Sequence, residues 1–415
     1  MPRTNNLLTA IDLGTHRCCC VIAEITGPES VEVIGVGSRR TDGIRKGVIV
    51  NLEALVASIR GAIDQAESDA NATVHSVIAS VPAAQAKSFT SRGGVTVASR
   101  DRVVTRKDLA KVDEMVRAVQ IPPGQSILHV VPQEFTLDGQ EGIQDPVGMT
   151  GSRLEGSFHV VTVPQQTAQH VVAALNAAHI DNVESLVYPL LASSEAVLTR
   201  EERDNGVFLI DCGAGTTDLA LFERGALWFT GSYPVAGDLI TNDISIGLRT
   251  PVPDAESLKR SQARAVAGVD DDLVLEVPTV GGGAPRLVAC SLLTQVVAPR
   301  VMEIFELSRQ IMDRFKLHHR ARAGAVLVGG TANLDGIVEV AEEVLGMPVR
   351  VGVPQGIASR AGEIDAPSFA GPVGLLAWEM RVGRRQRAAE TGVRNPLIRI
   401  RESVGRASQW FGQMF

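Results

Sequence analysis

The stretch Leu209-Ile210-Asp211-Cys212-Gly213-Ala214-Gly215-Thr216-Thr217-Asp218 has the pattern of an apolar strand that ends in an aspartate, followed by a turn rich in glycine and threonine. Glycine permits the tight backbone angles of such a turn and lets its N–H groups come close to a bound phosphate. The aspartate at the strand end can hold a hydrated divalent cation over the same phosphates. The stretch therefore predicts a phosphate-binding turn.

The same pattern occurs in a shorter form 199 positions earlier, in Ala10-Ile11-Asp12-Leu13-Gly14-Thr15. Apolar segments at Cys18–Ile25 and Leu219–Phe222 are expected to form the second strand of each pair. Either aspartate alone would be an ordinary residue at the end of a strand. Two such turns that face each other, however, would hold a nucleotide from both sides. We therefore expect two related halves with a cleft between them.

A third segment, Ala325–Asn333, has the pattern of a buried strand that runs into a Gly329-Gly330-Thr331 turn. A helix is expected to follow at Leu334–Val344. Nucleotides often bind at such strand-to-helix turns. The three segments in this order resemble the actin/Hsp70/sugar-kinase ATPase superfamily. We therefore expect an α/β fold of two related lobes around a nucleotide cleft.

Length and charge limit the possible functions. With 415 residues the chain is too long for one compact core, so two or more subdomains are expected. The net charge of −7 argues against a nucleic-acid partner. Residues 381–415, however, contain eight arginines and two glutamates and carry a net charge of +6. A basic tail on an acidic body predicts an anionic partner for the tail alone.

The five cysteines and the N-terminus point to an ordinary cytosolic protein. Cys18, Cys19 and Cys20 are consecutive in an expected strand, where neighbours point to opposite faces and cannot all bind one metal. Buried, reduced cysteines are the simpler interpretation. The first residues have no apolar signal-peptide core, and no run reaches the roughly 18 apolar residues of a membrane span.

Residues from about 84 to 162 have strand and helix signals of their own and are interpreted as a module inserted into the first half. Thr105-Arg106-Lys107-Asp108 predicts a helix start, and strands are expected at Ser126–Phe135 and Ser157–Val163. Further along, Leu292–Met312 predicts a long amphipathic helix.

The last twenty residues predict an amphipathic helix that follows an Arg-rich, aperiodic linker at 382–395. Large apolar side chains opposite arginines are typical of a helix that lies in a membrane interface. The alternative is a C-terminal helix docked on the protein's own core. The residues that fall within one arc of about 140° are Leu397, Ile400, Val404, Ala407, Trp410, Phe411, Met414 and Phe415. The arginines expected to meet anionic lipid are Arg399, Arg401 and Arg406.

Several ten-residue motifs closely resemble the FtsA family of bacterial cell-division actin homologues. They are Ile127-Leu128-His129-Val130-Val131-Pro132-Gln133-Glu134-Phe135, the segment 142–155 (Gly-Ile-Gln-Asp-Pro-Val-Gly-Met-Thr-Gly-Ser-Arg-Leu-Glu), and Val235-Ala236-Gly237-Asp238-Leu239-Ile240 with Glu256-Ser257-Leu258-Lys259 downstream.

This resemblance implies an actin-like fold with an FtsA-type inserted subdomain and a C-terminal amphipathic helix. Subdomain 1A would comprise residues 1–83, 163–200 and 365–381, and the insert, subdomain 1C, residues 84–162. Subdomain 2A would comprise 201–235 and 318–364, and subdomain 2B residues 236–317. The linker at 382–395 and the membrane-targeting helix at 396–415 would follow.

The resemblance also implies ATP and Mg²⁺ in the cleft. The residues implied for the phosphates are Asp12, Gly14, Thr15, Asp211, Gly213, Gly215, Thr216 and Thr217, with Asp12 and Asp211 near the metal. Those implied for adenine and ribose are Gly237, Glu256, Lys259, Gly329, Gly330 and Thr331. Glu256 and Lys259 alone could equally be a solvated pair on a helix face.

Implied partners are the C-terminal peptide of FtsZ, further copies of the chain in protofilaments, the anionic membrane surface and later division proteins. Together they would tether FtsZ to the inner face of the cytoplasmic membrane at the division site. The long helix near residue 300 is expected to face FtsZ, with Arg300 and Glu303 as candidate contacts.

Turnover is expected to be slow. Rapid hydrolases of this superfamily have a Gln or Glu near the start of the linking helix, but here Tyr188 precedes Pro189 and Glu184 lies four residues away. We therefore expect a nucleotide switch with weak ATPase activity at most. The alternatives are a PilM-like actin homologue of a pilus machine, which should lack the tail, and a small-molecule kinase, for which no acceptor-binding residues are evident.

Overall fold

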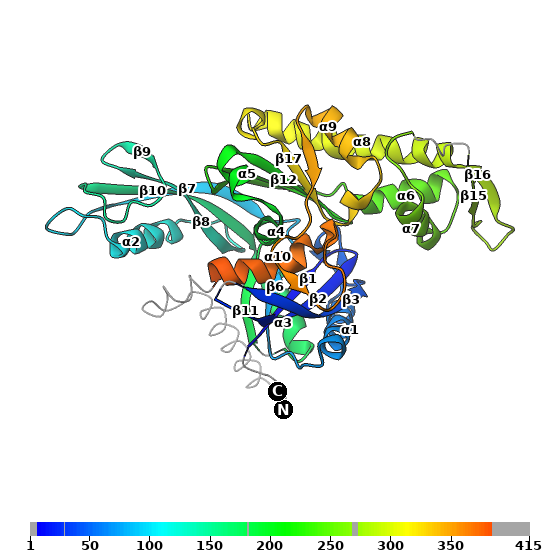
Figure 1. Ribbon diagram of the computed structural model, residues 1–415, viewed down its shortest axis with the longest axis horizontal. Helices are drawn as coiled ribbons and strands as arrows, with labels where there is room; N and C mark the ends of the chain where they lie inside the picture. Colours follow the sequence, from blue (N-terminus) through cyan, green and yellow to red (C-terminus); the bar gives the residue numbers. More distant parts are fainter. Residues whose placement is uncertain (1–5, 29, 181, 268–272, 384–415) are drawn as a thin grey trace.

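A computed structural model describes residues 6–28, 30–180, 182–267 and 273–383 of the chain. Figure 1 shows an elongated molecule with two sheets at its centre, a separate sheet at one end and a helical region with a small hairpin at the other. The tail expected at 396–415 lies outside the described residues, as does all but the start of the linker. Within the described part, no helix is long and apolar enough to cross a bilayer.

The first central sheet has six strands in the order β11-β6-β1-β2-β3-β19. The hairpin of β1 (Leu7–Leu13) and β2 (Arg17–Ile25) continues antiparallel into β3 (Val31–Arg40), and β6 (Ser76–Ser80) and β11 (Asn182–Val187) add in parallel on the other side. Two helices, α1 (Leu52–Ala70) and α3 (Gln165–Ala177), share one core with its outer face.

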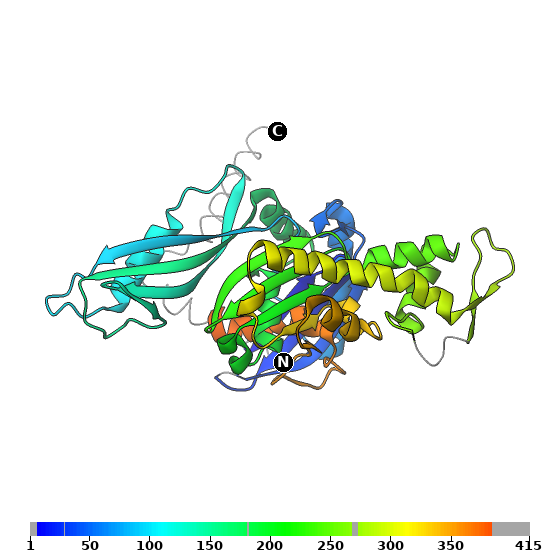
Figure 2. The ribbon, with the colours of Figure 1, turned by 90° about the horizontal axis from the view of Figure 1, so that it is seen from above.

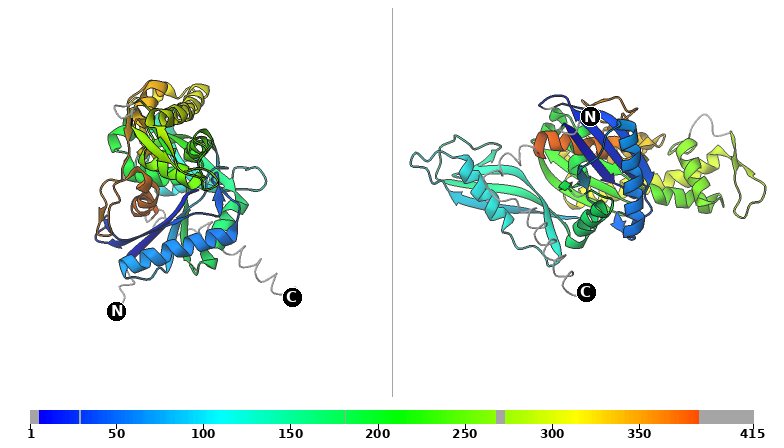
Figure 3. Two further views of the ribbon diagram at one scale, coloured as in Figure 1. Left: turned by 90° about the vertical axis from the view of Figure 1, so that its right-hand side faces the viewer. Right: turned by 90° about the horizontal axis from the view of Figure 1, so that it is seen from below.

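The second central sheet has the same plan, with the strand order β14-β13-β12-β17-β18. β12 (Val207–Cys212), β13 (Thr217–Glu223) and β14 (Ala226–Tyr233) form an antiparallel meander, and β17 (Ala325–Val328) and β18 (Val349–Val351) add in parallel. The duplicated sequence pattern therefore corresponds to a duplicated fold, and the end-on view in Figure 3 shows the two lobes stacked.

One core joins the two lobes. It contains residues of both sheets together with α4 (Pro189–Val197) and α10 (Ala370–Trp378). The two helices meet backbone to backbone, because a Cβ added at Gly374 would lie 2.1 Å from the carbonyl oxygen of Ala192. Glycine at this position allows the close approach.

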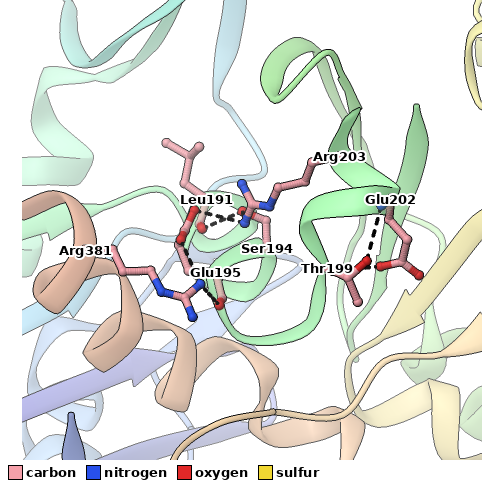
Figure 4. Close-up of polar contacts among 7 residues, drawn as sticks. All are labelled: Leu191, Ser194, Glu195, Thr199, Glu202, Arg203 and Arg381. Atoms are coloured by element: carbon pink, nitrogen blue, oxygen red, sulfur yellow. Dashed lines mark hydrogen bonds and ion pairs between the residues drawn. The ribbon is translucent and has the colours of Figure 1, made fainter. Parts of the chain in front are cut away.

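Ion pairs extend this junction at the end of α4 (Figure 4). Glu195 forms an ion pair with Arg203 of α5 (Arg200–Asn205) at 2.9 Å, and both side chains are largely buried. Arg381, which follows α10 in a short π-helical segment (Glu379–Gly383), donates to the backbone oxygen of Glu195 at 3.1 Å. Arg381 therefore ties the segment after α10 to the end of α4, close to the last described residue.

The outer face of the second sheet shares a core with α6 (Gly237–Gly247), α8 (Cys290–Arg314) and α9 (Ile337–Leu345). α7 (Val252–Ser261) packs against α6. Figure 2 shows α8 starting beside the hairpin of β15 (Val274–Val277) and β16 (Arg286–Ala289) and crossing this lobe. The sequence analysis predicted no strands here, because both are short and half exposed.

The insert forms its own sheet in the order β7-β10-β8-β9, covered by α2 (Arg106–Arg117). The strands are β7 (Lys87–Thr96), β8 (Gln125–Leu137), β9 (Gln140–Ile143) and β10 (Arg153–Pro164). The expected helix start is confirmed, since the Thr105 N–H donates to the Asp108 carboxylate at 2.9 Å. A separate apolar cluster fills the space between sheet and helix.

Two predicted helices begin elsewhere. The helix expected from Leu334 is preceded by a 3₁₀ turn (Gly330–Asn333) and starts at Ile337, because Gly336 adopts a positive φ of 74° and resets the chain direction. The sequence also predicts a helix at Glu256–Arg264, but α7 begins four residues earlier, at Val252, and a proline occupies its first turn.

We expect Gly374→Ala to destabilise the protein by about 1–3 kcal/mol, because the new methyl group forces α10 away from α4. The midpoint of urea unfolding, followed by circular dichroism, measures the change. Gly283→Ala is the matched control, since its Cβ would meet nothing closer than 3.9 Å. Equal midpoints for the two variants would contradict the close helix contact.

Candidate functional site

A cleft of about 810 Å³ lies between the two lobes and brings together residues far apart in the sequence. Its lining contains twelve of the fourteen residues implied for nucleotide binding. The two exceptions are Thr217, whose side chain is fully buried and donates to the Val235 oxygen, and Gly237, which is buried beneath the lining. The twelve are Asp12, Gly14, Thr15, Asp211, Gly213, Gly215, Thr216, Glu256, Lys259, Gly329, Gly330 and Thr331.

The two turns at the bottom of the cleft have the same internal geometry. In the first, the Gly14 N–H donates to the Arg17 oxygen at 3.0 Å, and in the second the Gly213 N–H donates to the Thr216 oxygen at the same distance. They also approach each other, because a Cβ at Gly215 would lie 2.6 Å from the Thr15 hydroxyl oxygen. Glycine is therefore required where the turns meet.

Three aspartates lie at this end of the cleft. Burial raises the pKa of Asp211 to about 7, and the carboxylates of Asp218 and Asp12 contribute to the rise. Burial also raises the pKa of Asp12, against the lowering effects of Ser80 and Arg17. The region therefore carries concentrated negative charge that a cation would neutralise.

This donor set fits a hydrated Mg²⁺ that shares its coordination with phosphates. Carboxylate oxygens are its preferred protein ligands, and it usually keeps several waters. Within the described residues, no group of three or more Asp, Glu, His or Cys side chains is placed to enclose a metal alone. Asp12 and Asp211 could therefore hold the ion only together with water and ligand oxygens.

The Gly-Gly turn after β17 lies beside the second phosphate turn and lines the same cleft. Gly329 has a positive φ of 88°, and a Cβ there would lie 2.4 Å from an Asp211 carboxylate oxygen. A Cβ at Gly330 would meet nothing within 4 Å and would project into open space. The two glycines thus have different roles: the first fits against the protein, and the second leaves room in the cleft.

Glu256 and Lys259 are not a solvated pair. Their side chains are 21% and 13% exposed and form an ion pair at 2.6 Å. Lys259 also donates to the Gly237 oxygen at 3.1 Å and to the Thr241 hydroxyl at 2.8 Å, so it joins α7 to α6. Burial alone would raise the pKa of Glu256, but Lys259 and Thr241 hold it below its usual range.

Arg17, Gly371 and Asp218 are among the lining residues that the predicted set omitted. Arg17 donates to the Ser368 oxygen at 2.6 Å and stacks on the Phe369 ring at 4.6 Å. A Cβ at Gly371 would lie 3.0 Å from an Asp12 carboxylate oxygen. Asp218 lies in the quoted motif itself and could have been identified there, whereas the Arg17 contacts join residues about 350 positions apart and leave no sequence signal.

No Glu or Gln at the start of α4 reaches the cleft in the described part of the chain. The Tyr188 side chain is 2% exposed, its pKa is raised by burial, and its N–H donates to a ring nitrogen of His129 at 2.9 Å. Glu184 accepts from the Ser76 hydroxyl on the first sheet. The carboxylates in the lining are Asp12, Asp211, Asp218, Glu256 and Asp335.

Arg300 and Glu303 lie on α8, away from the cleft lining. Arg300 forms an ion pair with Asp243 of α6 at 2.6 Å, and each side chain is about a quarter exposed. It also contacts Glu303, which is 44% exposed. Arg300 therefore already has an internal role, and Glu303 is the more available of the two to a partner.

Comparison with known proteins agrees with this architecture. The family model "Cell division protein FtsA" matches residues 208–374, and the model "SHS2 domain inserted in FTSA" matches residues 83–162. Cell division protein FtsA of Pseudomonas aeruginosa is 37% identical over 382 residues, covering 91% of this chain and 90% of that protein. Its counterpart in Borreliella burgdorferi is 34% identical, with 91% of each chain covered.

Solved structures with lower identity share the fold. The PilM-PilN type IV pilus biogenesis complex matches with a TM-score of 0.64 at 17% identity, covering 91% of this chain and 99% of that one. MreB5 of Spiroplasma citri bound to ADP gives 0.57 at 14% identity, covering 92% and 99%. The MamK double helical filament gives 0.50 at 12% identity, covering 90% and 99%.

The actin-like fold is thus shared with several kinds of protein, whereas both family models and the relatives at 34–37% identity along about nine-tenths of the chain are FtsA. The chain belongs to the FtsA family of cell-division actin homologues.

Proposed function

We propose that this protein binds ATP with Mg²⁺ between its two lobes. The observation that carries the proposal is the pair of equivalent turns that meet in one cleft, with Asp12 and Asp211 beside them. Thr15, Gly14 and the glycines of the second turn would contact the phosphates. Gly237, Glu256, Lys259, Gly329, Gly330 and Thr331 would surround the ribose and adenine. The fold relative MreB5, whose structure was solved with ADP bound, supports a nucleotide in this kind of cleft.

We further propose that the protein forms filaments and tethers FtsZ to the inner face of the cytoplasmic membrane at the division site, where later division proteins are recruited. Membership of the FtsA family supports this role over that of a PilM-like pilus protein or a small-molecule kinase. MamK has the same fold and was solved as a double helical filament, which supports self-assembly. The basic, amphipathic sequence at 396–415 would be the membrane anchor.

Gly330→Val should weaken Mg²⁺-ATP binding by at least about tenfold, or 1.4 kcal/mol, because its side chain would fill space in the cleft. Isothermal titration calorimetry measures the affinity. Gly283→Val, in the open loop of the β15–β16 hairpin, is the control and should bind normally. Unchanged affinity in Gly330→Val would remove this turn from the binding site.

Asp211→Asn should stabilise the metal-free protein above pH 7. The pKa of Asp211 is raised from 3.8 to about 7 on folding, so the stability contributed by its protonation is lost as pH rises through 7. The amide removes this loss, so the thermal midpoints of variant and wild type should diverge as pH rises from about 4 to about 7 and stay apart above it. The same variant should lose Mg²⁺-ATP affinity. A variant that is less stable at pH 8 would contradict the charge-repulsion account.

Glu303→Lys should weaken binding of an FtsZ C-terminal peptide by about tenfold, because Glu303 is partly exposed on α8 while Arg300 is occupied by Asp243. Fluorescence anisotropy of a labelled peptide measures the affinity. Glu53→Lys, an exposed residue at the start of α1 in the other lobe, makes the same charge change as a control. If both variants bind like wild type, this part of α8 is not the FtsZ-binding face.

The tail should bind anionic vesicles weakly as a single copy and strongly as part of a filament. Burial of Trp410, Phe411 and Phe415 would supply a few kcal/mol, and Arg399, Arg401 and Arg406 about 1 kcal/mol each. Ordering of the helix offsets part of this sum, so strong attachment requires several tails at once.

Co-flotation with anionic liposomes tests this for the wild type, Trp410→Glu and a truncation after Asn395. We expect the wild type to float, both variants to remain in solution, and high salt to reduce flotation. Equal flotation of all three proteins would exclude the helix as an anchor.

A further inference from the structure

The insert carries a cluster of exposed cations although the body of the protein is acidic. The cluster lies in the loop before α2 and in the first half of that helix. Residues 100–111 also contain two acids, but Asp108 is buried and Asp101 alone is exposed. We call this cluster the α2 basic face. Its members are Arg100, Arg102, Arg106, Lys107 and Lys111, and all of their side chains are exposed.

These cations do little to hold the insert together. Within the described part of the chain, ion pairs to a carboxylate are absent for Arg100, Arg106, Lys107 and Lys111. Arg102 donates only to the neutral hydroxyl of Ser152, at 3.1 Å. The acids Asp113 and Glu114 follow in the second half of α2, where Asp113 pairs with Arg117 at 2.5 Å. The charges at the start of the helix are therefore available to a partner.

Two of these cations also occupy a position that does not favour the helix. Arg106 and Lys107 lie in the first turn of α2, where the helix dipole favours acids and disfavours cations. Asp108 provides the favourable charge there, because its carboxylate accepts from the Thr105 N–H at 2.9 Å and from the Thr105 hydroxyl at 2.6 Å. The cations are thus not explained by the stability of α2, whereas an anionic partner would compensate for their placement.

The α2 basic face lies near the place where the chain leaves the body towards its tail. Burial lowers the pKa of His129 to about 4, and the charge of Arg117 at the end of α2 adds to this effect. The His129 ring in turn contacts Trp378 of α10, with the ring centroids 5.8 Å apart. The view from below in Figure 3 shows both α2 and α10. Since α2 has 12 residues and is about 18 Å long, its cations lie roughly one helix length from the end of α10.

A membrane that receives the tail would lie within reach of this face. The linker at 382–395 spans at most about 50 Å when fully extended, which exceeds the length of α2. Lipid headgroups of the cytoplasmic leaflet are anionic and attract lysine and arginine within about one Debye length. Met115, one turn after Lys111, is 53% exposed and adds an apolar side chain of the kind that enters a membrane interface.

We propose that the α2 basic face binds anionic lipid headgroups and forms a second membrane contact of the protein. The inference rests on the proposed attachment through residues 396–415 and extends it to the folded body. One weak amphipathic segment binds a membrane reversibly, and a basic surface is the kind of second signal that makes attachment stable. Two contacts would also turn the α2 side of the insert towards the bilayer, which restricts the orientation of the protein on the membrane.

Flotation of the full-length protein with vesicles of phosphatidylglycerol and phosphatidylcholine tests this contact. Lys107→Glu/Lys111→Glu should raise the lipid concentration for half-maximal binding about tenfold and weaken its dependence on salt. Lys107→Arg/Lys111→Arg keeps the charge and should bind like wild type. Lys316→Glu/Arg322→Glu makes the same charge change at exposed residues of the second lobe, after α8, and is the matched control. It should bind within about twofold of wild type.

A fluorophore that responds to solvent polarity reports the contact directly. Attached at Met115→Cys, it should shift its emission to shorter wavelength on anionic vesicles, whereas the same label at Lys316→Cys should not. Both labels are placed in a Cys290→Ser background, because the other cysteines are buried.

Lys107→Glu places an acid in the first turn of α2 and should not lower the unfolding midpoint, so lost flotation is not explained by unfolding. Flotation of Lys107→Glu/Lys111→Glu equal to that of wild type would overturn the proposal and leave this face to an acidic protein partner. An equal loss in the Lys316→Glu/Arg322→Glu control would overturn it as well. A wild type that does not bind anionic vesicles would instead refute the attachment through the tail, and this second contact with it.

Discussion

The arrangement of the molecule depends on the negative charge of carboxylates that are buried in the cleft. Asp12 and Asp211 occupy equivalent strand ends in the two lobes, and bringing the lobes together brings their carboxylates together. Burial raises the pKa of Asp211 to about 7, and the carboxylates of Asp218 and Asp12 add to the rise. Without a cation or protons this contact opposes closure of the lobes, so a cation that neutralises both carboxylates would favour closure. The repulsion between these carboxylates would thus make closure of the lobes depend on a bound cation.

Apolar packing between the two lobes offsets this repulsion. α4 and α10 belong to one core that contains residues of both sheets, and Gly374 lets the helices touch along their backbones. The junction is ordered further by the Glu195–Arg203 ion pair, which is largely buried and therefore screened less by salt than a surface pair. The lobes therefore join through this apolar layer as well as where the two turns meet.

The sequence predicted the two hairpins, their turns and the third strand because glycine, aspartate and alternating apolar residues leave local signals. Twelve of the fourteen residues predicted for the nucleotide lie in the cleft lining, since those signals coincide with part of the lining. It could not show that the Thr217 hydroxyl is directed to Val235, or that Arg17 reaches Ser368, because these contacts depend on how distant elements pack. The short strands β15 and β16 were not predicted for a different reason. Half-exposed strands of four residues are too short to show a periodic pattern of apolar side chains.

The insert connects physically to both lobes although its chain leaves and re-enters only the first. Its strands β8 and β10 contact β14, where Gln133 donates to the Leu227 oxygen at 3.0 Å and His159 contacts the Thr230 hydroxyl at the same distance. Burial lowers the pKa of His159 to about 4, so this contact stays uncharged at neutral pH. β14 pairs with β13, which carries Asp218 at the cleft. A rotation of the second lobe about the cleft must therefore either carry the insert with it or break these buried hydrogen bonds, and the cost of leaving such groups unpaired favours joint movement.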